Sequence, residues 1–188
     1  MDILDNHRLA GVRWAPSPHH DARPAGINPE LVVVHCVSLP EGVYGTGAPE
    51  RLFLGSLDTT EHASFADLAG LTVAPHVLID RAGEIVQLVA FDRRAWHAGV
   101  SAWHGRSGCN AFSIGIELEG CVAEGYAPAQ YESLARVLVT LIGRYAGLSV
   151  ERVVGHSEIA PGRKQDPGAG FAWSALLRGV IGAVVAHR

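Results

Sequence analysis

Hydrophobic residues along the chain follow two periods, one typical of strands and one typical of helices. The run Leu31–Cys36 is almost wholly apolar and β-branched, which predicts a central strand buried on both faces. Residues Ser113–Gly120 alternate instead, with Ile114, Ile116 and Leu118 on one face. A strict period of two predicts a second strand with one apolar face.

The other face of this second strand carries Glu117 and Glu119 beside Gly115. Carboxylates on the inward face of a central strand are costly unless they are paired or catalytic. An edge strand with a wet face would give the same alternation. Both readings stay open at this stage.

Further elements follow from local patterns. Two apolar runs, Val73–Ile79 and Glu84–Val89, flank a turn with a glycine, which predicts a β-hairpin. His76 in the first run fits a packed core histidine. The helical period predicts a helix over Pro128–Tyr145 and another over Phe171–Ala186.

The remaining segments are less regular. Residues 1–29 are rich in proline, histidine, arginine and aspartate, which predicts an N-terminal arm without regular structure. Ser38–Thr60 is a long glycine-containing loop, typical of a binding element. Ser64–Leu71 is compatible with a short helix. We find no internal repeat, so we expect one domain over residues 1–188, with its core in residues 30–186.

Composition narrows the class of protein. The net charge of −4 argues against nucleic acid as a partner. No apolar run approaches the roughly 20 residues that span a bilayer, so we expect no membrane partner. The three cysteines are odd in number and widely spaced, which favours a reducing compartment. The N-terminus lacks the basic start and apolar core of a secretory signal, and we expect a cytoplasmic enzyme.

The candidate chemistry gathers in a late loop. His156 follows a β-branched run, and a loop of glycine and proline then carries Lys164 and Asp166. His35, in the early strand, could complete a set of two imidazoles and one carboxylate, although taken alone it also fits a core histidine. Such a set binds Zn²⁺ and leaves a fourth position for water. Glu117 could then move protons and Lys164 could stabilise an oxyanion.

The segment Phe91–Asn110 is dense in arginine, histidine and tryptophan separated by glycines. Arginines bind carboxylates and aromatic rings form flat apolar walls. The segment is therefore a candidate binding rim. A surface loop with a solvated charge cluster would have the same composition.

Four segments carry a family resemblance: LVVVHCVSLP, AFDRRAWHAGVSAWHGR, CNAFSIGIELEG and GHSEIAPGRKQDPG. Together they resemble the AmpD-type 1,6-anhydro-N-acetylmuramyl-L-alanine amidases of the amidase_2 group, which share a fold with peptidoglycan recognition proteins. The resemblance runs from about Pro16 to the last helix. It implies an α/β (α+β) fold, a single mixed β-sheet flanked by helices with zinc at one rim.

The resemblance also implies roles for individual residues. The zinc ligands fall on His35, His156 and Asp166, the acid/base glutamate on Glu117, and the transition-state lysine on Lys164. The substrate-side loop falls on four residues: Trp96, His97, Arg106 and Asn110. Of these, Arg106 is the residue implied to bind a carboxylate of the peptide stem. Two positions depart from the family pattern: Cys36, where the family has asparagine, and Thr72, where it has arginine.

The implied reaction is hydrolysis of the amide between the lactyl group of N-acetylmuramic acid and L-alanine. The implied partner is a soluble 1,6-anhydromuropeptide from cell-wall recycling, handled by a monomer. A phage-type or wall-cutting amidase acting on intact peptidoglycan is the second hypothesis. A non-catalytic muropeptide-binding module is the third, although such a module would be expected to lose a ligand or the acid/base group.

Overall fold

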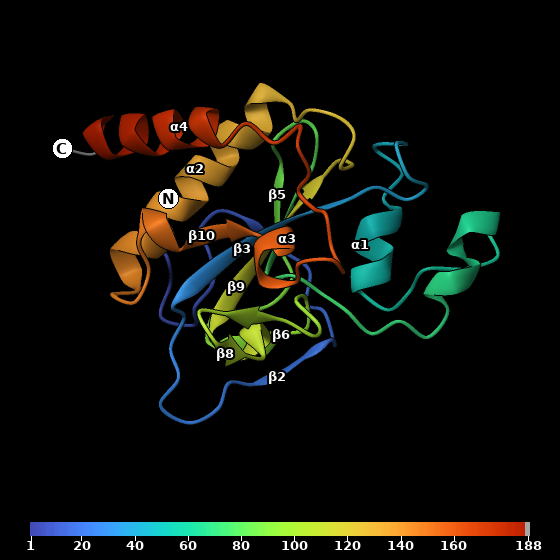
Figure 1. The fold of residues 1–188 in the computed structure, drawn as a ribbon, viewed down its shortest axis with the longest axis horizontal. Coiled ribbons are helices and arrows are strands. Elements are labelled where there is room, and N and C mark those ends of the chain that lie inside the picture. Colours follow the sequence, from blue (N-terminus) through green and yellow to red (C-terminus); the bar gives the residue numbers. More distant parts are fainter. Residues whose placement is uncertain (187–188) are drawn as a thin grey trace.

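A six-stranded mixed sheet forms the centre of the computed structural model, which describes residues 1–186 (Figure 1). From edge to edge its strands are β1 (Arg13–Trp14), β5 (Ile85–Gln87), β4 (Val77–Ile79), β9 (Ser113–Glu119), β3 (Leu31–Val37) and β10 (Val153–Gly155). Neighbouring strands from β4 to β10 run parallel, whereas β4 and β5 are antiparallel. This is the mixed sheet that the sequence predicts. Of the predicted domain 1–188, residues 187–188 lie outside the described part.

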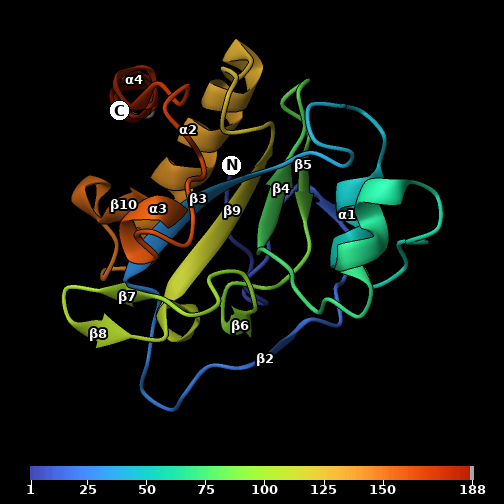
Figure 2. The ribbon, with the colours of Figure 1, turned by 45° about the vertical axis from the view of Figure 1, so that its right-hand side comes forward.

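Two helices lie on one side of the sheet (Figure 2). The helix α2 (Pro128–Arg144) packs its apolar residues against the sheet, and α4 (Trp173–Ala186) packs against α2. Both helices were predicted; α4 begins two residues later than expected. The start of α2 needs no Ser, Thr, Asp or Asn cap because the Gln130 side chain accepts the backbone N–H of Ala127 at 3.0 Å.

The strand β9 occupies a central place, between β4 and β3, so the edge-strand reading is wrong. Its alternation is as predicted: Ile114, Ile116 and Leu118 are fully buried in the cluster that includes the apolar side of α2. The face with Glu117 and Glu119 therefore looks the other way. That opposite face is covered by short and irregular segments, including α1 (Ala48–Phe53).

The N-terminal arm contains regular structure, contrary to the prediction. Strand β1 adds to the sheet beside β5, and β2 (His20–Ala22) pairs with β6 (Arg93–Ala95). Composition missed these strands because the arm has few apolar residues. Their pairing satisfies backbone groups along an otherwise open strand edge.

Other boundaries also differ from prediction. The predicted loop Ser38–Thr60 contains α1, which begins with Pro49 near its first turn and buries Leu52 and Phe53. The short helix expected within Ser64–Leu71 is present as a 3₁₀ helix, η1 (Ala63–Leu68).

The predicted hairpin forms, but β4 begins only at Val77, so His76 precedes the strand rather than lying in it. His76 is fully buried and its Nδ1 accepts the backbone N–H of Gly115 at 3.0 Å. The interpretation of His76 as a core histidine is thus confirmed. The backbone N–H of His76 also donates to the Gly115 carbonyl at 2.9 Å, so backbone pairing with β9 extends to this residue.

The remaining elements are short: β7 (Ala102–Trp103), β8 (Arg106–Ser107), η2 (Cys109–Ala111), η3 (Val150–Arg152) and α3 (His156–Ile159). The three cysteines, Cys36, Cys109 and Cys121, are all free thiols. Among the residues described, no helix combines the length and apolar character needed to cross a membrane.

Candidate metal centre

Three side chains from distant parts of the chain meet beside the sheet. His35 lies in the carboxyl-terminal half of β3, and His156 opens α3 directly after β10, the neighbour of β3. Asp166 reaches the same place from the late loop. Parallel strands bring their carboxyl ends to one edge of a sheet, which is where binding sites form in such folds.

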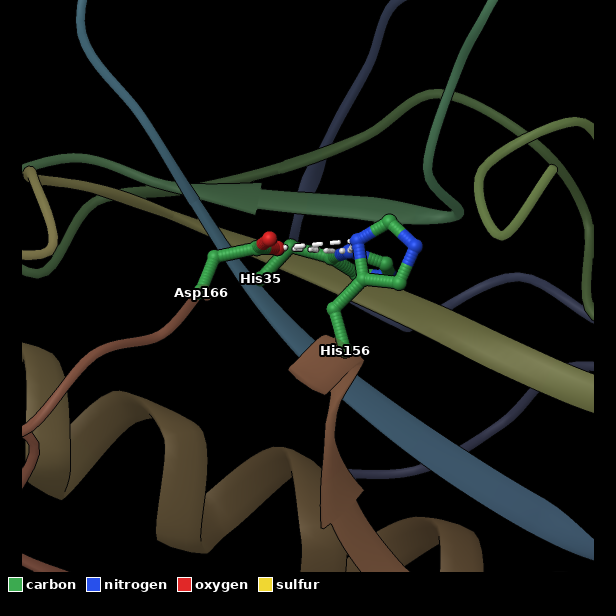
Figure 3. A group of neighbouring side chains, drawn as sticks. All are labelled: His35, His156 and Asp166. Carbon is green, nitrogen blue, oxygen red and sulfur yellow. Dashed lines mark hydrogen bonds and ion pairs between the residues drawn. The ribbon is translucent and has the colours of Figure 1, made fainter. Parts of the chain in front are cut away.

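The three ligand atoms form a small triangle (Figure 3). His35 Nδ1 is 2.9 Å from His156 Nδ1 and 3.2 Å from Asp166 Oδ2, and the third side, His156 Nδ1 to Asp166 Oδ2, is 3.0 Å. A tetrahedral zinc with bonds of about 2.0–2.1 Å would hold its ligands roughly 3.3 Å apart. The set therefore has the spacing of three zinc ligands.

Burial makes this arrangement costly without a cation. The side chains of His35, His156 and Asp166 are only 3%, 4% and 14% exposed. Burial lowers the pKa of His35 to about 4, so this imidazole is neutral near pH 7. Burial alone would raise the pKa of Asp166, but hydrogen bonds to the two histidines hold it below its usual range. A buried carboxylate facing two imidazole side chains fits a divalent metal ion.

The loop that carries Asp166 is fastened to the start of α3. The backbone N–H of Ser157 donates to the Asp166 carbonyl at 3.0 Å. A Cβ on Gly155 would lie 2.8 Å from the ring of Pro167, so only glycine permits this close approach. The exposed Arg163 spans the gap to the segment before β7, donating to the carbonyls of Ala98 and Val100.

Glu117 is placed beside the ligand set. It is the register partner of His35 on the adjacent strand β9, and neighbouring strands lie about 4.8 Å apart. Its Oε2 is buried and has no hydrogen-bond partner among the described residues. Burial, reinforced by Asp166 and opposed by Lys164, raises its pKa well above the usual range. A carboxyl with a raised pKa beside a metal site can accept and return protons near neutral pH.

Lys164 is exposed on the same loop, two residues before Asp166. Its backbone N–H donates to the carbonyl of Ala160 at 3.0 Å, which fixes the loop beneath it. Its charge acts on both His35 and Glu117, lowering the pKa of each. The ammonium group is therefore within electrostatic reach of the site.

The four residues of the predicted substrate-side loop have different surroundings. Half-buried Trp96 lies beside His19, with ring centroids 6.3 Å apart. His97 bonds directly to His35, and Asn110 accepts backbone N–H groups of the chain around His97. Arg106 instead forms an ion pair with Glu30 and stacks over Phe112, and no described bond joins it to the three ligands.

A cavity of about 380 Å³ adjoins the ligand set. Cys36, Gln165 and Asp166 are among its lining residues. A larger cavity of about 800 Å³ lies elsewhere, lined by Arg13, Glu50 and other charged side chains. The smaller cavity is the better candidate for substrate because it touches a ligand.

Two further residues bond backbone groups of neighbouring segments, and sequence reasoning missed one of them, Arg23. Arg23, in the arm, donates to the carbonyls of Phe91, Asn110, Ala111 and Ser113. Glu119, predicted to face the cleft, accepts the backbone N–H groups of Gly45 and Arg81 at 2.5 and 3.3 Å. The alternation of β9 located Glu119 on the correct face, whereas nothing local distinguished Arg23 from an exposed arginine.

Comparisons with known proteins agree with this geometry. Residues 25–169 match the family described as N-acetylmuramoyl-L-alanine amidase, Amidase_2. The chain is 52% identical over 172 residues to the 1,6-anhydro-N-acetylmuramyl-L-alanine amidase AmpD of Enterobacter cloacae, covering 92% of this chain and 91% of that protein.

Solved structures give the same result. A crystal structure of a Se-Met AmpD derivative superposes with a TM-score of 0.91 at 51% identity, covering 94% of this chain and 98% of the other. The amidase AmiD from E. coli, solved with the substrate anhydro-N-acetylmuramic acid-L-Ala-D-γ-Glu-L-Lys, has a TM-score of 0.58 at 29% identity; the match covers 94% of this chain and 62% of that one. With its mixed sheet, its two-histidine, one-aspartate centre and these matches, the chain belongs to the N-acetylmuramoyl-L-alanine amidase family.

Proposed function

We propose that this protein is a zinc amidase that hydrolyses the bond between the lactyl group of N-acetylmuramic acid and L-alanine in soluble 1,6-anhydromuropeptides. The observation that carries the proposal is the 2.9–3.2 Å triangle of His35, His156 and Asp166, with Glu117 beside it. The AmpD relatives are named for this activity, and they match nearly the whole chain.

His35 Nδ1, His156 Nδ1 and Asp166 Oδ2 would hold the zinc ion. Zinc bound there would supply a Lewis acid that polarises the amide carbonyl and acidifies a water molecule. Three protein ligands leave a position open toward solvent, as a hydrolytic site needs. The same ligands accept other divalent ions as well.

Glu117 would act as the acid/base group. Its carboxylate would take the proton from the attacking water and deliver it to the leaving amine of L-alanine. The unpartnered Oε2 supports this role because it has no structural bond to break. Lys164 would stabilise the negative charge that develops on the carbonyl oxygen in the transition state.

The residues of the substrate-side loop would contact the sugar and the peptide stem of the substrate. The half-buried ring of Trp96 would offer an apolar wall to the sugar. Arg106 would bind a carboxylate of the peptide stem, replacing its present partner Glu30. His97 and Asn110 would shape the same rim from beneath.

The oligomeric state, the compartment and the domain organisation are also part of the proposal. We propose a monomer, acting in the cytoplasm, in which residues 1–188 form one amidase domain. Three free thiols support a reducing compartment. A soluble fragment is favoured over the intact wall because the AmpD relatives are named for anhydromuropeptides.

The test is hydrolysis by the purified protein. Anhydromuropeptide and purified sacculi are each incubated with metal-free protein and with protein given one equivalent of Zn²⁺, and the released peptide is quantified. We expect rapid release from the soluble fragment with zinc only. Release mainly from sacculi would favour a wall-cutting amidase, and binding without release would identify a muropeptide-binding module.

A further inference from the structure

Asn110 joins two backbone groups that lie behind the ligand set. Its side-chain oxygen Oδ1 accepts the N–H of His97 at 3.1 Å and the N–H of Ala98 at 2.7 Å. These two neighbours reach the two different histidine ligands. The His97 ring contacts His35, and the Ala98 carbonyl contacts His156.

The bonds on the His35 side have a fixed direction. Ser113 Oγ donates its only proton to the carbonyl of Cys109 at 2.7 Å, so toward His97 it can act only as an acceptor. His97 Nε2 therefore carries the proton in the 3.1 Å contact to Ser113 Oγ.

A neutral imidazole with its proton on one nitrogen is an acceptor at the other. His97 Nδ1 thus accepts from His35 Nε2 at 2.9 Å. The proton of His35 is held on Nε2, and the lone pair on its Nδ1 faces His156 and Asp166. The opposite direction along this chain would put a proton on Nδ1 and block the ligand position.

The bonds on the His156 side lead to the same tautomer. His156 Nε2 lies 3.1 Å from the carbonyl oxygen of Ala98, which can only accept. Arg163 Nη2 is 3.3 Å from the same ring nitrogen but donates to that same carbonyl at 2.6 Å. The proton of His156 is therefore on Nε2, and its Nδ1 lone pair also faces the ligand set.

Tight packing holds the His97 ring in place between Ser113 and His35. A Cβ on Gly115 would lie 2.4 Å from Cγ of the His97 ring, so the ring rests directly on the backbone of β9. Only glycine leaves room for an imidazole there.

We propose that Asn110, His97 and Ala98 form an orienting clamp that fixes the tautomers of both histidine ligands and directs their Nδ1 lone pairs at one metal ion. His97 and Asn110 are positioning residues in this proposal. The inference rests on the proposed metal function of His35, His156 and Asp166. Partners of this kind behind metal ligands typically contribute 10- to 100-fold in metal affinity.

The experiment has two readouts on one set of variants. Long-range ¹H–¹⁵N correlation spectra of the metal-free protein report which ring nitrogen of each histidine carries the proton. Competition with a chromogenic chelator reports the affinity for Zn²⁺. Neither readout depends on catalysis.

Each variant has its own expected pattern. His97→Leu should release the tautomer of His35 alone, whereas Asn110→Leu should release those of His35 and His156 together. Both variants should bind Zn²⁺ about 10- to 100-fold more weakly. His97→Asn, whose amide oxygen can replace Nδ1 as an acceptor, and Asn110→Asp, which keeps an oxygen, should recover most of the affinity.

The controls distinguish a change in the tautomers of the histidine ligands from a general loss of folding. His62→Leu changes an exposed histidine whose ring bonds to Ser64 in η1, and it should alter neither readout. If His97→Leu fails to fold, Ser113→Ala makes the same test, because removing the acceptor should free the tautomers of His97 and His35.

Two results would overturn the clamp. The first is a proton on Nδ1 of His35 in the unaltered metal-free protein. The second is that the tautomers and the zinc affinity stay unchanged in His97→Leu or Ser113→Ala. Failure of the proposed function would look different. The unaltered protein would then bind no divalent ion, while the spectra of its metal-free form would still decide the orientation of both rings.

Discussion

His35 and Glu117 are register partners on the parallel strands β3 and β9. One carries a ligand nitrogen and the other an unpartnered carboxylate oxygen, and both strands are central in the sheet. The distance between the proposed metal ligand and the proposed acid/base group is thus set by strand pairing rather than by a loop. A site built on such elements is held closely in place.

Glu117→Gln should separate catalysis from metal binding. The amide keeps the shape of the side chain but cannot accept the proton, so we expect kcat on anhydromuropeptide to fall by roughly 10²- to 10⁴-fold. Zinc content, measured by elemental analysis, should be unchanged. Glu132→Gln, on the exposed side of α2, is the matched control and should have full activity. Full activity in Glu117→Gln would remove the proposed role.

Lys164→Met should act on the transition state. Loss of the ammonium should lower kcat by roughly 10²- to 10³-fold, while KM changes little because the exposed side chain has no described partner to lose. Steady-state kinetics with zinc-loaded protein measure both constants. A change confined to KM would instead make Lys164 a substrate-binding residue.

Removal of the metal should abolish hydrolysis. Dialysis against a strong chelator should leave folded, inactive protein, and one equivalent of Zn²⁺ should restore the rate. Asp166→Asn should bind zinc more weakly because a neutral amide replaces the only charged ligand. Activity that survives complete chelation, checked by metal analysis, would contradict the proposal.

The metal-free protein should lose stability on mild acidification. Burial lowers the pKa of His35 to about 4 from 6.5, so between these values the unfolded chain binds a proton that the folded chain does not. Stability is therefore complete above pH 6.5 and declines as the pH falls toward 4, by roughly 3 kcal/mol for this residue. Urea unfolding at several pH values in chelator measures the slope. His35→Asn should have a shallower slope, and an equal slope would exclude this cause.

Arg23→Leu should destabilise the fold although it lies outside the ligand set. The change leaves four backbone carbonyls without their donor, and we expect a loss of about 2–4 kcal/mol. Denaturant unfolding measures it. Arg178→Leu, an exposed arginine of α4, should cost less than about 0.5 kcal/mol. Equal stability of the two variants would show that the arm bonds contribute nothing.

Much of this protein could be predicted from local patterns. The apolar run at β3, the alternation of β9 and the helical periods of α2 and α4 each identify an element and its buried side, because burial selects residue type at a fixed period. Weakly apolar elements were missed. Strands β1 and β2 exist through pairing with partners about 70 residues away, which a local window does not contain.

For the site, the sequence by itself determined the kinds of groups available: two histidines, an aspartate, a glutamate and a lysine, with a family pattern that grouped them. Only the tertiary structure decided which atoms meet. Three contacts show this: Nδ1 of His35 faces Nδ1 of His156, Asn110 bonds the backbone N–H of His97, and Arg106 binds Glu30. Each joins residues that a local sequence pattern does not connect. Side-chain direction and hydrogen-bond partner are properties of the packed chain, and residue spacing does not encode them.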